Sequence, residues 1–85
     1  MVNKTLQKNL EILKFKESNN YGSMVGYIDD IRFTAIEHPF GKVFLLTADC
    51  SITRTVSQIE ENVTVEADLK EIAEVMVKMY EKVKS

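Results

Sequence analysis

The sequence predicts an α+β domain: an antiparallel β-meander of three to four strands, flanked by an N-terminal helix and a longer C-terminal helix in the order α-β-β-β-β-α. The helices are predicted because apolar residues recur at helical spacing near both ends of the chain. The strands are predicted because runs of alternating apolar and polar residues fill the middle, separated by turn-forming residues. Short connections between these runs favour pairing of neighbouring strands.

Length and composition indicate a single domain over residues 1–85. A chain of 85 residues, 45% hydrophobic and 28% charged, has the composition of one folded unit. Cys50 is the only cysteine, so no disulfide can form within the chain, which fits a reducing compartment. No apolar run approaches the roughly 20 residues of a membrane span, and no signal-peptide pattern follows Met1. We therefore expect a cytoplasmic protein without a membrane partner.

The charge distribution disfavours a protein whose main function is to bind phosphate groups. The net charge is −2, and Lys and Glu alternate along most of the chain instead of forming a basic stripe. This lowers the expectation of a nucleic-acid partner without excluding one. The amino-acid composition is rich in Asn, Lys, Ile and Glu, and in this it resembles proteins from AT-rich bacterial genomes and their phages.

The N-terminal segment predicts a short amphipathic helix with an ambiguous end. Its apolar residues at helical spacing are Val2, Leu6, Leu10 and Leu13. Asn3 is the expected N-cap. Residues 13–16 alternate apolar and polar, as a strand would, so the helix either extends to about Lys16 or stops near Glu11 and passes into a strand. The longer helix is the preferred prediction.

The middle of the chain predicts the strands of the meander. The strand-like runs are 24–29, 31–37, 42–48 and 52–59, with a further short piece at 63–65. The turns expected between them are 18–23, Asp29-Asp30, 38–41, 49–51 and 60–62. The run 42–48 is apolar at both alternating positions. This pattern predicts a strand in the middle of a sheet covered on both faces.

The C-terminal helix, predicted over 66–84, carries more apolar surface than one sheet face requires. Its apolar stripe consists of Leu69, Ile72, Ala73, Met76, Tyr80 and Val83, widened by Val75, Val77 and Met79. The arc covers roughly 200°, about twice the width that a helix packed on one face needs. Either the N-terminal helix or a second copy must cover the excess. We expect a homodimer through this helix, with Val75, Met79 and Tyr80 as partner-binding residues.

The stretch around His38 and Pro39 is predicted to be a hairpin turn. Pro39 favours the turn, and Gly41 is expected to supply an unusual backbone angle that closes it. His38 is the only histidine, which argues against a metal site, and Cys50 lacks any CxxC spacing. Phe40, at the tip of the hairpin, is a candidate anchor for a protein partner.

Two acidic pairs, Asp29-Asp30 and Glu60-Glu61, are the remaining candidates for catalysis or cation binding. Paired carboxylates can share a proton or bind a hard cation. Both pairs fall at expected turns, where solvated acids are common, and neither has the spacing of a calcium loop. We therefore expect no catalytic residues, no metal site and no cofactor.

A candidate anion site is formed by Arg32, Thr34 and Arg54 on predicted strands. Arg32 and Arg54 are the only two arginines in the chain, and the planar guanidinium of arginine suits carboxylate or phosphate recognition. The alternative is that the arginines pair with Glu37 or Asp29 on a solvated face.

Taken together, these features predict a small non-enzymatic binding or regulatory protein that acts by protein–protein interaction. A regulator, an adaptor or a phage or mobile-element inhibitor of a host or defence protein would fit. The alternative is a binder of a small anion or nucleic acid on a sheet face carrying Arg32 and Arg54. An enzyme would require His38, Cys50 or the acidic pairs to converge in space.

Overall fold

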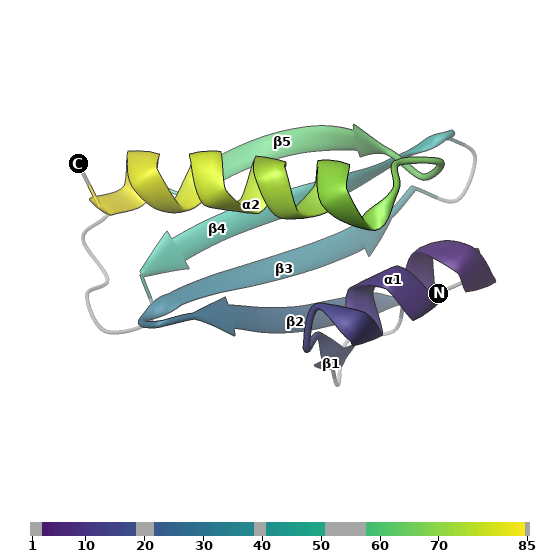
Figure 1. Cartoon of the computed structure of the whole chain (residues 1–85), viewed down its shortest axis with the longest axis horizontal. Helices are drawn as coiled ribbons and strands as arrows, with labels where there is room; N and C mark the ends of the chain where they lie inside the picture. Colours follow the sequence, from purple (N-terminus) through teal and green to yellow (C-terminus); the bar gives the residue numbers. More distant parts are fainter. Residues whose placement is uncertain (1–2, 19–21, 39–40, 51–57, 85) are drawn as a thin grey trace.

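The computed structural model describes residues 3–18, 22–38, 41–50 and 58–84. It contains the helices α1 (Lys4–Ile12) and α2 (Leu69–Lys84) and the strands β1 (Lys16–Glu17), β2 (Ser23–Ile28), β3 (Ile31–Glu37), β4 (Val43–Cys50) and β5 (Ile59–Thr64). The strands form one antiparallel sheet in the order β1-β2-β3-β4-β5. Both helices lie on the same face of this sheet, with α1 toward β2 and α2 across β3, β4 and β5 (Figure 1). The predicted α+β meander with a helix at each end is confirmed, and β1 is an additional short edge strand.

The start of α1 agrees with the prediction, but its end does not. The Asn3 side chain accepts a hydrogen bond of 2.9 Å from the backbone N–H of Leu6, as an N-cap does. The helix ends at Ile12, so the preferred extension to Lys16 is wrong, and the alternative of an early end followed by a strand is correct.

A left-handed residue ends α1. Lys14 has a φ of 72°. Its N–H donates to the Glu11 carbonyl (3.0 Å), and the N–H of Phe15 donates to the Leu10 carbonyl (2.9 Å). These two bonds define a Schellman motif, which normally has glycine at the left-handed position. Because Lys stands there instead, the sequence lacked the usual stop signal.

The hairpin between β2 and β3 forms where it was predicted. Ile28 pairs with Ile31, which leaves Asp29 and Asp30 as a two-residue loop. Asp29 has a φ of 53°, a left-handed conformation that Asp tolerates better than most residues. The short acidic loop thus closes without glycine.

The connection between β3 and β4 is also tight, although its glycine does not have the backbone angle that was predicted for it. The N–H of Gly41 donates to the His38 carbonyl, and the N–H of His38 donates to the Val43 carbonyl, both at 3.4 Å. Gly41 does not have a positive φ, so the predicted unusual backbone angle is wrong. A Cβ atom there would lie 3.2 Å from the Cβ of His38, so the position is crowded. Phe40 and Pro39 lie outside the described residues.

Two predicted breaks are strand in the structure. Asp49 and Cys50 belong to β4, where they pair with Arg32 and Ile31. Residues 60–62 lie inside β5, which among the described strands pairs only with β4, at the edge of the sheet. Acidic side chains are tolerated on this strand because they remain exposed to solvent. The predicted strand 52–59 falls mostly outside the described residues.

The last helix begins later than predicted, at Leu69 and not at residue 66. The Asp68 carboxylate accepts a hydrogen bond of 2.8 Å from the N–H of Glu71, so Asp68 caps the helix. From there α2 continues to Lys84, as predicted.

The core lies between the sheet and the two helices. Side chains alternate along each strand, so every second residue points toward the helices. The residues of this core that are at most 1% exposed are Leu6, Leu10, Met24, Ile31, Phe33, Ala35, Phe44, Leu46, Ala48, Ile72 and Met79. Burying each large apolar side chain contributes about 1.5–3 kcal/mol. This packing uses one face of the sheet, and among the described residues no helix lies on the other.

Candidate functional site

The face of the sheet opposite the helices is the main candidate for an interaction surface. We call it the helix-free face, and its apolar members are Val25, Tyr27, Ile36, Val43 and Leu45. The run 42–48 was predicted to be covered on both faces, and this is wrong for the described fold because both helices lie on one side. The two-sided apolar pattern of β4 therefore places Val43 and Leu45 on the helix-free face.

The strand register spreads these apolar residues along the face, with Tyr27 opposite Arg32 and Ile36 opposite Ser23, four positions apart along β3. Ile36 of β3 lies directly opposite Leu45 of β4. Val43 follows on the same face of β4, and Val25 and Tyr27 share this face of β2. Tyr27 is 58% exposed and Ile36 is 41% exposed, so water contacts much of this surface. Exposed large apolar side chains grouped on one face are typical of interaction sites.

A row of smaller polar side chains crosses the centre of the helix-free face. Thr34 lies between Val25 and Thr47 in the register, and Thr47 is only 6% exposed. The predicted site residue Thr34 thus shares a face with Arg32, as expected from their spacing on one strand. Arg54 lies outside the described residues, so its position relative to both remains a prediction.

An aspartate on the neighbouring strand holds Arg32. The Nε and Nη2 atoms of Arg32 donate hydrogen bonds to the two carboxylate oxygens of Asp49, at 3.2 and 2.6 Å. This bidentate pair raises the pKa of the Arg32 guanidinium, chiefly through the hydrogen bonds to Asp49. The expected alternative partners were Glu37 and Asp29, but the pairing of β3 with β4 selects Asp49. An anion at Arg32 would have to displace this carboxylate.

The predicted partner-binding residues of α2 face inward to different degrees. Met79 is 1% exposed and packs in the core, which does not fit the prediction that it contacts a partner. Val75 and Tyr80 are partly buried and pack against the same core. Val77 is 50% exposed, so α1 leaves part of the apolar arc of α2 uncovered.

The C-terminal end of α2 is fixed to the β2–β3 hairpin by its two aspartates. The Tyr80 hydroxyl donates to Asp29 Oδ2 (2.8 Å), and Lys84 Nζ lies 2.6 Å from Asp30 Oδ1. The hydrogen bond with Lys84 lowers the pKa of Asp30 and raises that of Lys84, while Asp29 raises the pKa of Tyr80. The pair Asp29-Asp30 was interpreted as a solvated turn, and this is incomplete because both carboxylates hold the helix.

Of the remaining reactive side chains, Cys50 meets the acidic hairpin, because its Sγ donates to Asp30 Oδ2 at 3.6 Å, whereas His38 lies at the other end of the strands. His38 follows the end of β3 that pairs with the start of β4, whereas Cys50 ends β4 opposite Ile31. About 20 Å of strand separates these two ends. Glu60 and Glu61 are consecutive residues of a strand, so they point to opposite faces. Within the described part of the chain, no group of three or more His, Cys, Asp or Glu side chains could hold a metal ion.

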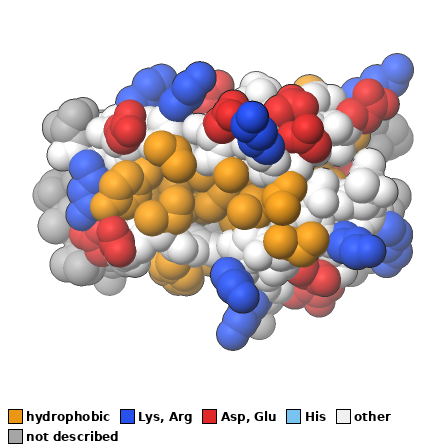
Figure 2. Space-filling model, viewed as in Figure 1, with side chains coloured by type: hydrophobic (Ala, Val, Ile, Leu, Met, Phe, Trp, Pro, Cys, Tyr) orange, Lys and Arg blue, Asp and Glu red, His pale blue; other side chains and the backbone are white. Residues whose placement is uncertain are grey.

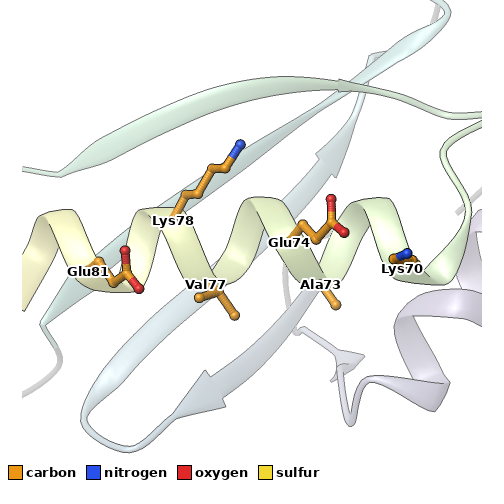
Figure 3. A pocket seen from close by; sticks show the side chains of 6 residues that line it. All are labelled: Lys70, Ala73, Glu74, Val77, Lys78 and Glu81. Atoms are coloured by element: carbon orange, nitrogen blue, oxygen red, sulfur yellow. The ribbon is translucent and has the colours of Figure 1, made fainter.

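A second candidate surface lies on the outward side of α2. Figure 2 shows hydrophobic side chains in a stripe along the middle of the helix-covered face, bordered by charged side chains. A shallow hollow on α2 is lined by Lys70, Ala73, Glu74, Val77, Lys78 and Glu81 (Figure 3). The close view shows Ala73 and Val77 projecting from one side of the helix and Glu74 and Lys78 from the other. We call these six residues the α2 stripe.

Comparison with known proteins adds no family to this description. No protein-family model matches the chain, and no curated protein or solved structure is significantly similar to it. Among the described residues, neither helix has the length and apolar character needed to cross a membrane. The helix-free face and the α2 stripe are therefore the two candidate functional surfaces of the protein.

Sequence reasoning identified neither surface directly. The signal for the helix-free face was the unbroken apolar run of β4, which needed the positions of both helices to be interpreted correctly. The signal for the α2 stripe was the width of the apolar arc, which pointed to the right helix. Val77, the most exposed apolar residue of that helix, received no special weight.

Proposed function

We propose that this is a small non-enzymatic binding protein that regulates another protein by covering part of its surface with the helix-free face. The observation that carries the proposal is the exposure of Tyr27 and Ile36 on the sheet face that neither α1 nor α2 covers. The sheet is a firm platform for them, since its other face packs against the hydrophobic core.

The composition of the helix-free face suits a protein partner. Tyrosine combines a large apolar ring with a hydrogen-bonding hydroxyl, and it is enriched among residues that dominate binding energy. Burying Tyr27 and Ile36 against a partner would contribute about 1.5–3 kcal/mol each. The ion pair of Arg32 and Asp49 lies beside Tyr27 in the register and would form a polar rim.

A preformed sheet face also limits the entropic cost of binding. Side chains on paired strands have restricted freedom before the partner arrives, so less is lost on association. A regulator or inhibitor of this kind acts by occupancy and needs no catalytic group. That role agrees with the separation of His38 from Cys50 along β3 and β4.

The proposal is tested by quantitative affinity purification from extracts of the organism that encodes the protein. The test variant is Tyr27→Lys/Ile36→Lys, and the matched control is Ile12→Lys, which changes an apolar side chain of α1 that is 53% exposed. Circular dichroism checks that each variant is folded. We expect one protein to co-purify in fixed proportion with the wild type and the control, and to be lost with the test variant.

Three outcomes would overturn the proposal. One is equal recovery of the partner with the test variant, and another is the absence of any specific partner. A third is recovery of nucleic acid in place of protein, lost on nuclease treatment and on raising the salt concentration, which would favour the anion-binding alternative.

A further inference from the structure

The α2 stripe has an arrangement of charges that is complementary to itself. Lys70 and Glu81 lie equally far in sequence from the midpoint between residues 75 and 76, and they carry opposite charges. Glu74 and Lys78 lie nearly equally far from the same midpoint, again with opposite charges. Ala73 and Val77 form the apolar part between them.

We propose that the α2 stripe is the contact surface of a homodimer, in which α2 packs antiparallel against α2 of a second copy. A two-fold axis at the midpoint of the stripe places Lys70 opposite Glu81 of the second copy and Glu74 beside Lys78 of the second copy. The symmetry repeats both pairs, because a two-fold interface uses the same patch on each subunit. Val77 then packs against Ala73 of the second copy.

The charges of the stripe are available for such a contact. The ion pairs of Arg32 with Asp49 and of Lys84 with Asp30 do not involve the α2 stripe. The four charged residues are exposed, and Val77 is half exposed among them. A partner with a face of one charge sign would meet repulsion at half of these positions, whereas a second copy in this register meets only opposite charges.

The size of the stripe predicts a weak dimer. One helix pair with two small apolar residues on each side buries less than the roughly 1,200 Å² of a stable interface. Self-association should therefore depend on protein concentration and weaken as salt screens the ion pairs. In the dimer both helix-free faces point away from the two-fold axis, so each dimer could bind two copies of a partner. The dimer itself does not depend on the proposed function.

The experiment uses two charge variants of the full chain. Lys70→Glu/Lys78→Glu makes the stripe wholly acidic, and Glu74→Lys/Glu81→Lys makes it wholly basic. A control, Lys4→Glu/Lys8→Glu, applies the same charge change as the acidic variant to exposed residues of α1. Sedimentation equilibrium at low salt, up to about 1 mM protein, measures self-association, and circular dichroism checks the fold.

We expect the wild type and the α1 control to dimerise, with association weakened by roughly tenfold or more in each stripe variant. An equimolar mixture of the acidic and basic variants should associate again, since opposite charges then meet at every position. The proposal is overturned by a wild type that stays monomeric throughout, by stripe variants that dimerise like the wild type, or by a mixture that remains monomeric. Dimerisation of the Tyr27→Lys/Ile36→Lys variant is expected to be unchanged, which separates this test from that of the proposed function.

Discussion

The contact between Phe15 and Gly26 offers a quantitative test of the packing argument. A Cβ atom at position 26 would lie 2.7 Å from Cδ1 of the Phe15 ring, much closer than carbon atoms approach without strain. Phe15 is 2% exposed and follows the left-handed residue that ends α1, so its ring cannot move away easily. Gly26→Ala should therefore overpack this part of the core.

The expected magnitude follows from two opposing effects. Overpacking costs about 1–3 kcal/mol, while replacing glycine reduces the entropy of the unfolded chain and returns about 0.4–1 kcal/mol. Gly26→Ala should then lower the free energy of unfolding by about 1–2 kcal/mol. In a Phe15→Leu background the smaller, branched side chain leaves room for the methyl group. There the same substitution should be neutral or slightly stabilising.

The assay is a double-mutant cycle measured by urea unfolding with circular dichroism. We expect a coupling energy of about 1–2 kcal/mol between positions 15 and 26. Gly22→Ala is the matched control, because Gly22 has a φ of 79° and no atom within 4 Å of a built Cβ. Its cost arises from the backbone and should be the same in both backgrounds. Equal destabilisation by Gly26→Ala in both backgrounds would refute the packing argument.

Two further predictions concern stability. Lys14→Gly should raise the free energy of unfolding by about 0.5–1 kcal/mol, because glycine adopts the left-handed conformation without strain; an unchanged or lower urea midpoint would contradict this. The ion pair of Asp30 and Lys84 should stabilise the fold only in the pH range where Asp30 is deprotonated and Lys84 is protonated. The lowered pKa of Asp30 means that its contribution is lost as pH falls below about 4, and the raised pKa of Lys84 means that it is lost as pH rises above about 10. The thermal midpoint of Lys84→Met should be slightly lower than that of the wild type, and the difference should be largest between these two pH limits. A difference that does not change with pH would show that the ion pair does not contribute to stability.

The two candidate surfaces lie on opposite sides of one small domain. The helix-free face is formed by strands, and the α2 stripe lies on the outward side of a helix that covers the other face. One surface can therefore be altered without disturbing the other. This arrangement makes the tests of partner binding and of self-association independent.

Several local features were predictable from the sequence because short-range chemistry specifies them. Asn3 caps α1 because its side chain reaches the N–H of Leu6 three residues away. Asp29 and Asp30 form a two-residue loop because alternating runs flank them on both sides. The spacing of Ile72, Met76 and Met79 places all three on one side of a helix, whatever that helix packs against.

Other features were decided by contacts between distant parts of the chain. The end of α1 depends on the burial of Phe15 against β2, which allows Lys14 to adopt a conformation that its own preferences disfavour. The passage of β5 through Glu60 and Glu61 depends on its pairing with β4 at the sheet edge, where charged side chains stay in water.

The candidate site shows the same division between sequence and tertiary structure. The sequence alone determined that Arg32 lies on a strand and that α2 has an over-wide apolar arc. The tertiary structure decided that Asp49 is the partner of Arg32, because the register of β3 with β4 sets them opposite each other. It also decided which face of the sheet is left open, because both helices pack on the same side. Periodicity reports which residues of an element share a face, but only the assembled layers determine which faces are covered.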